Sequence, residues 1–178
     1  EAVDNGILGG GYGIATDGSS ILQSGAKLTA TGNCGPGVAV CYDYHFYSDP
    51  ELVVEDGATI NSYHNYNYGL INDSIFTVKT GAHVILNENL SGGFDNYPYA
   101  TTTVEENADL VIKDNYGVGI NNGNNIPAQG FINDPDAIAT LNIKSGLITE
   151  NNKKTQMSYR GIGYIPVSSL EYGGGICN

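Results

Sequence analysis

A thirteen-residue pattern occurs four times without gaps, and this repetition constrains the fold more than any other feature of the chain. The copies are Ile21–Asn33, Val53–Asn65, Thr77–Asn89 and Thr103–Asn115. A fifth, shorter copy covers Leu141–Asn152. One supersecondary unit repeated at intervals of a few tens of residues is typical of a solenoid, in which stacked units share a continuous core.

Each position of the repeat suggests a structural role. The central position is held by Gly25, Gly57, Gly81 and Asn107. Glycine and asparagine tolerate a left-handed backbone, so we expect a sharp bend between two strands there. The positions three before and three after the bend are apolar, and alternation along a strand places them in the core. The closing position is Asn33, Asn65, Asn89 and Asn115, which predicts a ladder of stacked amides.

Short glycine-rich runs follow the copies and supply a third strand for each coil. They are Gly9–Ile14, Gly37–Val40, Tyr68–Ile71, Tyr116–Ile120, Arg160–Ile165 and Tyr172–Asn178. The sequence therefore predicts an all-β chain, a right-handed parallel β-helix of about six coils. The extra residues form loop insertions at Cys41–Pro50, Gly92–Thr101, Asn121–Pro135 and Lys153–Arg160. An antiparallel sandwich is the competing fold, but it does not explain the gapless repeat.

Composition limits the partners. The length of 178 residues suits a single domain, 1–178, and the formal net charge is −12. Such a surface repels phosphate backbones and anionic lipids, so we expect no nucleic acid partner. No apolar run is long enough to insert into a membrane. We expect no cofactor, although the many acids and amides leave room for calcium.

The three cysteines do not define a metal site. Cys34 and Cys41 flank a Gly-Pro-Gly turn and are candidates for a small disulfide loop, whereas Cys177 has no evident partner. Whether Cys34 and Cys41 are bonded stays open at this point, and cysteine usage does not fix the redox compartment.

The V-x-x-G-A-x-L-x-I-x-x-N core and the GxGI and GGGICN strands resemble the β-helix repeats of large bacterial surface proteins and of the pectate-lyase-like superfamily. This resemblance implies a secreted or cell-surface location. It also implies that the natural protein continues past Asn178, as a fragment of a longer array. The NTD, DD and GHG motifs of pectin hydrolases on this fold are absent, and the single arginine, Arg160, has no nearby Asp to complete a lyase site.

Tyrosine is the most suggestive residue type for function. The chain has 13 tyrosines and no tryptophan. Tyrosine beside Asn and Asp stacks on sugar rings and anchors protein partners. The candidate ligand-binding residues are Tyr42, Tyr44, Tyr47, Tyr97 and Tyr99. We favour a non-enzymatic adhesin or stalk segment that binds a glycan or a host or neighbouring protein. The alternatives are a glycan-active enzyme with a carboxylate pair and a spacer without any ligand.

Overall fold

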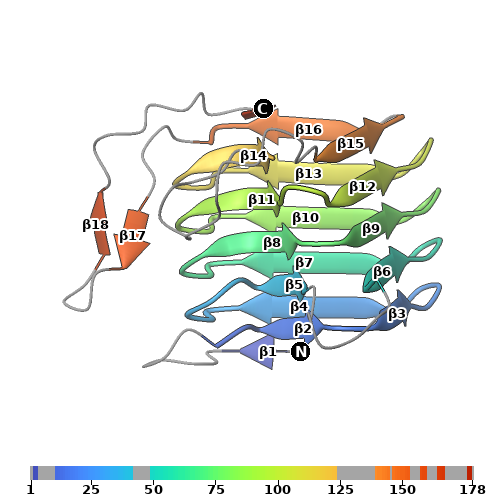
Figure 1. The fold of residues 1–178 in the computed structure, drawn as a ribbon, viewed down its shortest axis with the longest axis horizontal. Helices are drawn as coiled ribbons and strands as arrows, with labels where there is room; N and C mark the ends of the chain where they lie inside the picture. The colour runs from blue at the N-terminus through green and yellow to red at the C-terminus, as the bar shows by residue number, and fades with distance from the viewer. Residues whose placement is uncertain are drawn as a thin grey trace.

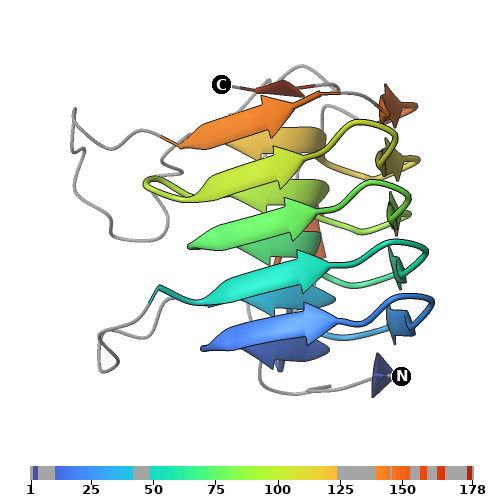
Figure 2. The same cartoon turned by 90° about the vertical axis from the view of Figure 1, so that its right-hand side faces the viewer.

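The computed structural model describes residues 2–3, 11–41, 49–123, 139–144, 146–152, 157–159, 164–166 and 176–177. All regular structure in these residues is β-strand, in three stacked parallel sheets and one small hairpin. Successive coils lie one above the other in both Figure 1 and Figure 2. The arrangement is consistent with a parallel β-helix, and the all-β prediction is confirmed. Within the described residues, no helix could span a membrane.

Each full coil contributes one strand to each sheet. Sheet A contains β1 (Ala2–Val3), β4 (Lys27–Thr31), β7 (Thr59–Tyr63), β10 (His83–Asn87), β13 (Asp109–Lys113) and β16 (Leu147–Glu150). Sheet B contains β2 (Ile14–Thr16), β5 (Val38–Val40), β8 (Tyr68–Asn72), β11 (Gly92–Asn96), β14 (Val118–Asn122) and β19 (Ile176–Cys177). Sheet C contains β3 (Ser19–Leu22), β6 (Glu51–Val54), β9 (Ile75–Val78), β12 (Thr101–Val104) and β15 (Thr140–Ile143).

The repeat predicts which residues of successive coils become neighbours. Val78 pairs in parallel with Val54 on one side and with Val104 on the other. All three are fully buried in the shared core. Phe76 and Phe94 are fully buried in the same core, with ring centroids 6.0 Å apart. Like side chains therefore stack coil upon coil, as the sequence pattern requires.

The bend position also behaves as predicted. Gly25, Gly57, Gly81 and Asn107 have φ of 71°, 68°, 77° and 60°, and Gly146 of the fifth copy has 71°. A second left-handed position, absent from the sequence prediction, lies just before each ladder asparagine. It is held by Gly32, His64, Glu88, Asp114 and Asn151, with φ between 53° and 68°.

Two predictions about the third strand were wrong. Gly92–Thr101 was expected to be a loop, but Gly92–Asn96 is strand β11 in the middle of sheet B. Its Ser-Gly-Gly-Phe run lacks the Tyr-Gly or Gly-x-Gly-Ile signature, and this hid it from the sequence comparison. The Arg160–Ile165 run was expected to join the same sheet. Instead β18 (Tyr164–Pro166) pairs antiparallel with β17 (Met157–Tyr159).

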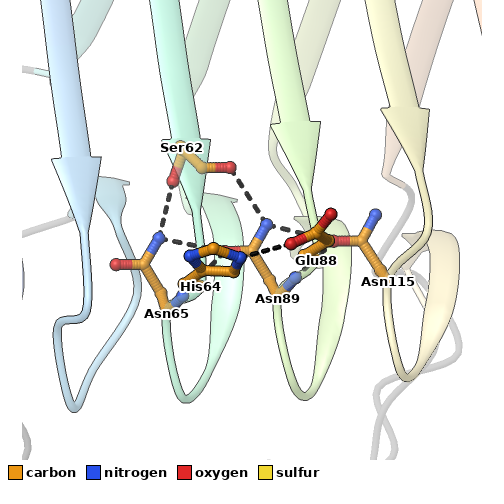
Figure 3. A network of polar contacts seen from close by, with 6 residues as sticks. All are labelled: Ser62, His64, Asn65, Glu88, Asn89 and Asn115. Carbon is orange, nitrogen blue, oxygen red and sulfur yellow. Dashed lines mark hydrogen bonds and ion pairs between the residues drawn. The ribbon is translucent and has the colours of Figure 1, made fainter.

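The closing asparagines form a buried ladder (Figure 3). Nδ2 of Asn65 donates to Oδ1 of Asn89 at 2.9 Å, and Nδ2 of Asn89 donates to Oδ1 of Asn115 at 3.0 Å. The same oxygens also accept backbone N–H groups of the preceding coil, at 3.1 and 2.9 Å. The ladder begins at Asn33 and ends at Asn152. Every amide–amide bond in it runs from the earlier coil to the later one.

The ladder explains a column of glycines in sheet B and the turns before it. A Cβ atom on Gly13, Gly37 or Gly69 would lie 2.6 Å from the Nδ2 of a ladder asparagine. On Gly93 it would lie 3.0 Å from Nδ2 of Asn115. The third strand must therefore approach the amides as bare backbone, and this accounts for the glycine-rich runs.

A charged row follows the edge between sheets C and A. Glu55, Lys79, Glu105 and Lys144 each donate a backbone N–H to the coil before, so they stack in succession with alternating sign. Lys79 Nζ donates to Glu105 Oε1 at 3.0 Å. This hydrogen bond raises the pKa of Lys79 and lowers the pKa of Glu105.

Candidate binding face

The outer face of sheet A carries two rows of side chains that cross neighbouring strands. The strand register aligns Thr29, Asn61 and Ile85 in one row. It aligns Thr31, Tyr63 and Asn87 in the next row. This second row lies nearer the turn between sheets A and B that carries the ladder asparagines, which we call the ladder turn. All six side chains point away from the core because they alternate with core or ladder-side residues along β4, β7 and β10.

A groove lies between these rows. Its lining residues are Thr29, Asn61, Tyr63, Ile85 and Asn87, and its volume is about 270 Å³. The lining has no ionisable acid or base apart from the tyrosine hydroxyl. It combines two amides, a threonine hydroxyl, an aromatic ring and an aliphatic side chain. We call these five residues the sheet A groove.

One polar atom of the sheet A groove is unsatisfied. Oδ1 of Asn87 is buried and has no hydrogen-bond partner, the one such side-chain atom found in the described residues. An unpaired buried acceptor costs about 1–3 kcal/mol, so native structures usually avoid it. A half-turn of the amide exchanges Oδ1 and Nδ2, which lets Asn87 present either a donor or an acceptor.

Histidine–carboxylate contacts lie on both sides of the sheet A groove. His83 Nδ1 contacts Asp109 Oδ2 at 2.8 Å beyond one row. His64 Nε2 contacts Glu88 Oε2 at the ladder turn, where both side chains occupy the left-handed position (Figure 3). The Tyr63 ring packs edge-on against the His64 ring, with centroids 5.2 Å apart. Tyr63 therefore packs against His64, which is itself held by Glu88.

Two of the five tyrosines predicted to bind a ligand lie in the described residues, Tyr97 and Tyr99. Tyr42, Tyr44 and Tyr47 lie outside the described residues. Tyr97 is partly buried against Tyr68, Ile71 and Val118 on the outer side of sheet B. Tyr99 is 63% exposed in the turn between β11 and β12, with φ of 69°. Bulky residues rarely adopt this left-handed conformation, and such strain is found most often at functional sites.

The outer side of sheet B holds a buried carboxyl group. Asp95 is 4% exposed and accepts a hydrogen bond from Nδ2 of Asn121 at 2.9 Å. Burial raises the pKa of Asp95 to about 7, the Asn121 hydrogen bond opposes the rise, and the charge of Asp73 adds to it. Asp73 lies on the adjacent coil, since Asn72 and Asn96 are paired and Asp73 follows Asn72.

Cys41, Asp73 and Tyr97 form one stacked row at the end of sheet B, because each N–H bonds to the preceding coil. Burial raises the pKa of Tyr97, with Asp95 and Asp73 adding to the effect. Burial and the charge of Asp73 raise the pKa of Cys41, while a hydrogen bond with Tyr12 lowers it. Cys34 and Cys41 are both free thiols, so the structure does not contain the candidate disulfide loop.

Metal binding gains no support from these clusters. Within the described ranges, no group of three or more His, Cys, Asp and Glu side chains is arranged to hold a metal ion. The two described histidines contact acids individually, one pair on each side of the sheet A groove.

Sequence reasoning missed a second amide ladder and the sheet A groove. Nδ2 of Asn72 donates to Oδ1 of Asn96 at 2.9 Å, and Nδ2 of Asn96 donates to Oδ1 of Asn122 at 2.8 Å. Thr102 completes it by donating to Asn96 Oδ1 at 2.8 Å. Each of these asparagines follows a ladder asparagine by seven residues, so the signal was present in the sequence. The groove depends on side chains from three coils and has no local signature.

Comparison of the chain with protein-family models, with curated proteins and with solved structures finds no match.

Proposed function

We propose that this chain is a non-enzymatic module of a secreted or cell-surface protein, an adhesin or stalk segment that binds a glycan or a protein partner. In this proposal a right-handed parallel β-helix serves as a stiff support, and its outer face provides the contact surface. The observation that carries the proposal is the sheet A groove, on a face crossed by rows of partly exposed side chains.

Rigidity of the support favours a binding role. The first amide ladder and the shared core hold the backbone beneath the sheet A groove, and the second ladder joins the coils at the end of sheet B. A preorganised surface loses less conformational entropy when it binds, so more of the contact energy appears as affinity. Exposed tyrosines on other parts of the coil surface, Tyr66, Tyr99 and Tyr116, add aromatic contact area at low entropic cost.

Binding of the intact chain to a printed array of glycans and a panel of extracellular matrix proteins tests the proposal. We expect saturable binding to at least one immobilised ligand, weakened by Tyr63→Ala or Tyr99→Ala. Tyr99→Gly is a useful companion variant, because glycine relieves the left-handed strain and keeps the fold intact. Absence of saturable binding on both surfaces would contradict the proposal and support the spacer.

A second candidate function is glycan cleavage, favoured by one specific observation. Asp95 has its pKa raised to about 7, which keeps a proton on the carboxyl group near neutral pH, and Asp73 lies on the adjacent coil. Inverting glycosidases use such a pair, one carboxylic acid and one carboxylate separated by roughly 6.5–9.5 Å. The near-complete burial of Asp95 counts against this function, because a polymer must reach the acid.

Release of reducing ends from a panel of polysaccharides distinguishes this second function. If the pair is catalytic, the intact chain releases reducing sugar and Asp95→Asn does not. Asp114→Asn removes the same charge from the ladder turn, outside the pair, and serves as the matched control. No release by the intact chain at pH 5 to 8 would dismiss the enzymatic candidate.

A further inference from the structure

We propose that Asn122–Gly123 is a site of spontaneous deamidation that the second amide ladder holds closed, so that the modification is confined to molecules in which the end of β14 has opened. The sequence contains two Asn-Gly pairs, Asn5–Gly6 and Asn122–Gly123. The structure describes the second pair, and the first lies outside the described residues. The proposal goes beyond the binding function, because it concerns the lifetime of the fold and needs no ligand.

The reaction requires only these two residues and water. The backbone nitrogen of Gly123 attacks the side-chain carbonyl carbon of Asn122 and forms a new C–N bond. The bond from that carbon to Nδ2 breaks, and Nδ2 leaves as ammonia with the Gly123 amide proton. The resulting succinimide ring takes up one water molecule and opens to aspartate or isoaspartate. Glycine favours this attack, because no Cβ atom hinders the approach of its nitrogen.

Both reacting groups are occupied in the folded chain. The N–H of Gly123 donates to the backbone oxygen of Asn96 at 2.8 Å. Oδ1 of Asn122 accepts from Nδ2 of Asn96 at 2.8 Å, and Nδ2 of Asn122 donates to the backbone oxygen of Ala139 at 3.4 Å. The Asn122 side chain is also nearly buried, with 9% exposed. Ring closure therefore requires that the end of β14 first leaves its neighbours.

The backbone explains why the reactive glycine is present at this place. Gly123 has a φ of 69°, in the left-handed region that residues with a side chain rarely adopt. A Cβ atom at this position would lie 2.9 Å from the Cβ atom of Ala139. The fold thus keeps the residue that makes Asn122 most reactive, and the hydrogen bonds of the ladder suppress the reaction.

Modification would prevent the coil from closing again. An aspartate at position 122 still accepts from Asn96, but it has no N–H for the Ala139 oxygen and it brings a negative charge into a nearly buried position. An isoaspartate lengthens the backbone by one carbon, which disturbs the register of Asn122 with Asn96. A transient opening is thereby converted into a permanent one.

Thr102 is a positioning residue for this closed state. Its buried hydroxyl donates to Oδ1 of Asn96 at 2.8 Å, which directs Nδ2 of the same amide towards Asn122. Ser62 provides a matched hydroxyl in the first ladder, where it accepts from Nδ2 of Asn65 at 3.0 Å. Each hydroxyl can be removed by a conservative substitution, so the contributions of the two ladders can be compared.

Peptide mapping by mass spectrometry, after incubation of the intact chain at one pH in buffer and in guanidinium chloride, tests the proposal. We expect Asn122 to deamidate at least about tenfold more slowly in the folded chain, because only the opened fraction reacts. In the unfolded chain Asn122 and Asn5 react at similar rates. Thr102→Val accelerates the reaction at Asn122 in buffer, whereas Ser62→Ala leaves it unchanged.

Equal rates at Asn122 in the folded and unfolded chain would overturn the proposal, and this comparison needs no variant to fold. If Thr102→Val and Ser62→Ala accelerate the reaction equally, modification passes through global unfolding, and closure by the second ladder is refuted. A thermal melt tests the consequence: Asn122→Asp lowers the melting temperature, while Asn142→Asp, the same change on an exposed side chain of β15, does not. An Asn122→Asp chain that melts like wild type would show that modification does not keep the coil open.

Discussion

The buried carboxyl group of Asp95 should make this protein less stable as the pH rises. The side chain is 4% exposed, and burial raises its pKa from 3.8 to about 7 in the folded state. The folded state therefore holds the proton more tightly than the unfolded state. A carboxyl group shifted in this direction stabilises the fold most at low pH, and its contribution is lost as the pH rises from about 4 to about 7.

The size of this effect follows from linkage. One unit of pKa difference corresponds to about 1.4 kcal/mol, so the complete penalty above pH 7 is roughly 4 kcal/mol. Part of it is already present at pH 5, where the unfolded carboxyl is ionised. Between pH 5 and pH 8 we expect the free energy of unfolding to fall by about 2–3 kcal/mol because of Asp95 alone.

Asp95→Asn isolates this contribution. Asparagine keeps an oxygen that accepts the 2.9 Å hydrogen bond from Asn121, and it does not titrate. Urea unfolding of both proteins at pH 5 and pH 8 should show the variant gaining about 2–3 kcal/mol relative to wild type at the higher pH. Asp114→Asn, with the same change of charge at the ladder turn, should show no such gain. Equal differences at the two pH values would refute the assignment of a raised pKa to Asp95.

Three further changes test the contacts between coils. Asn89→Ala removes the acceptor of the buried Asn65 amide and should lower the free energy of unfolding by about 3 kcal/mol or more, measured by urea unfolding. Gly69→Ala places a Cβ atom 2.6 Å from the Asn89 amide and should cost about 1–3 kcal/mol in the same assay, with a fully tolerated substitution arguing against the close approach. Lys79→Glu puts three acids in succession along the charged row and should cost no more than about 1 kcal/mol, an effect that 1 M NaCl should largely remove.

Sequence reasoning recovered the parts of the fold that depend on one coil. The bend at Gly25, Gly57 and Gly81, the stacking of like apolar residues and the buried asparagine column all follow from local preference and alternation, and the structure shows each of them. Strand β11 was missed, because its sequence departs from the other third strands while its backbone does not.

Features that depend on contacts between neighbouring coils could not be predicted from the sequence pattern. The sheet A groove requires the register that brings Asn61, Tyr63 and Asn87 together from β7 and β10. The raised pKa of Asp95 results from its burial on the outer side of sheet B, and the sequence does not indicate that this side chain is covered. Tyr97 was predicted as a contact residue from its type alone, whereas its ring is partly covered.

The uniform direction of the asparagine ladder makes coils interchangeable units. The Nδ2 group of each ladder residue donates to the next ladder oxygen in the following coil and also to a backbone carbonyl of the preceding coil, so successive coils present the same connectors above and below. The segment 66–89 begins just after one ladder asparagine and ends on the next, a distance of 24 residues. Its excision would join Asn65 directly beneath Asn115 with the donor–acceptor order intact. A chain of this kind can be shortened or lengthened by whole turns during evolution, while additional residues of a partial turn fall between strands, as those between β5 and β6 do.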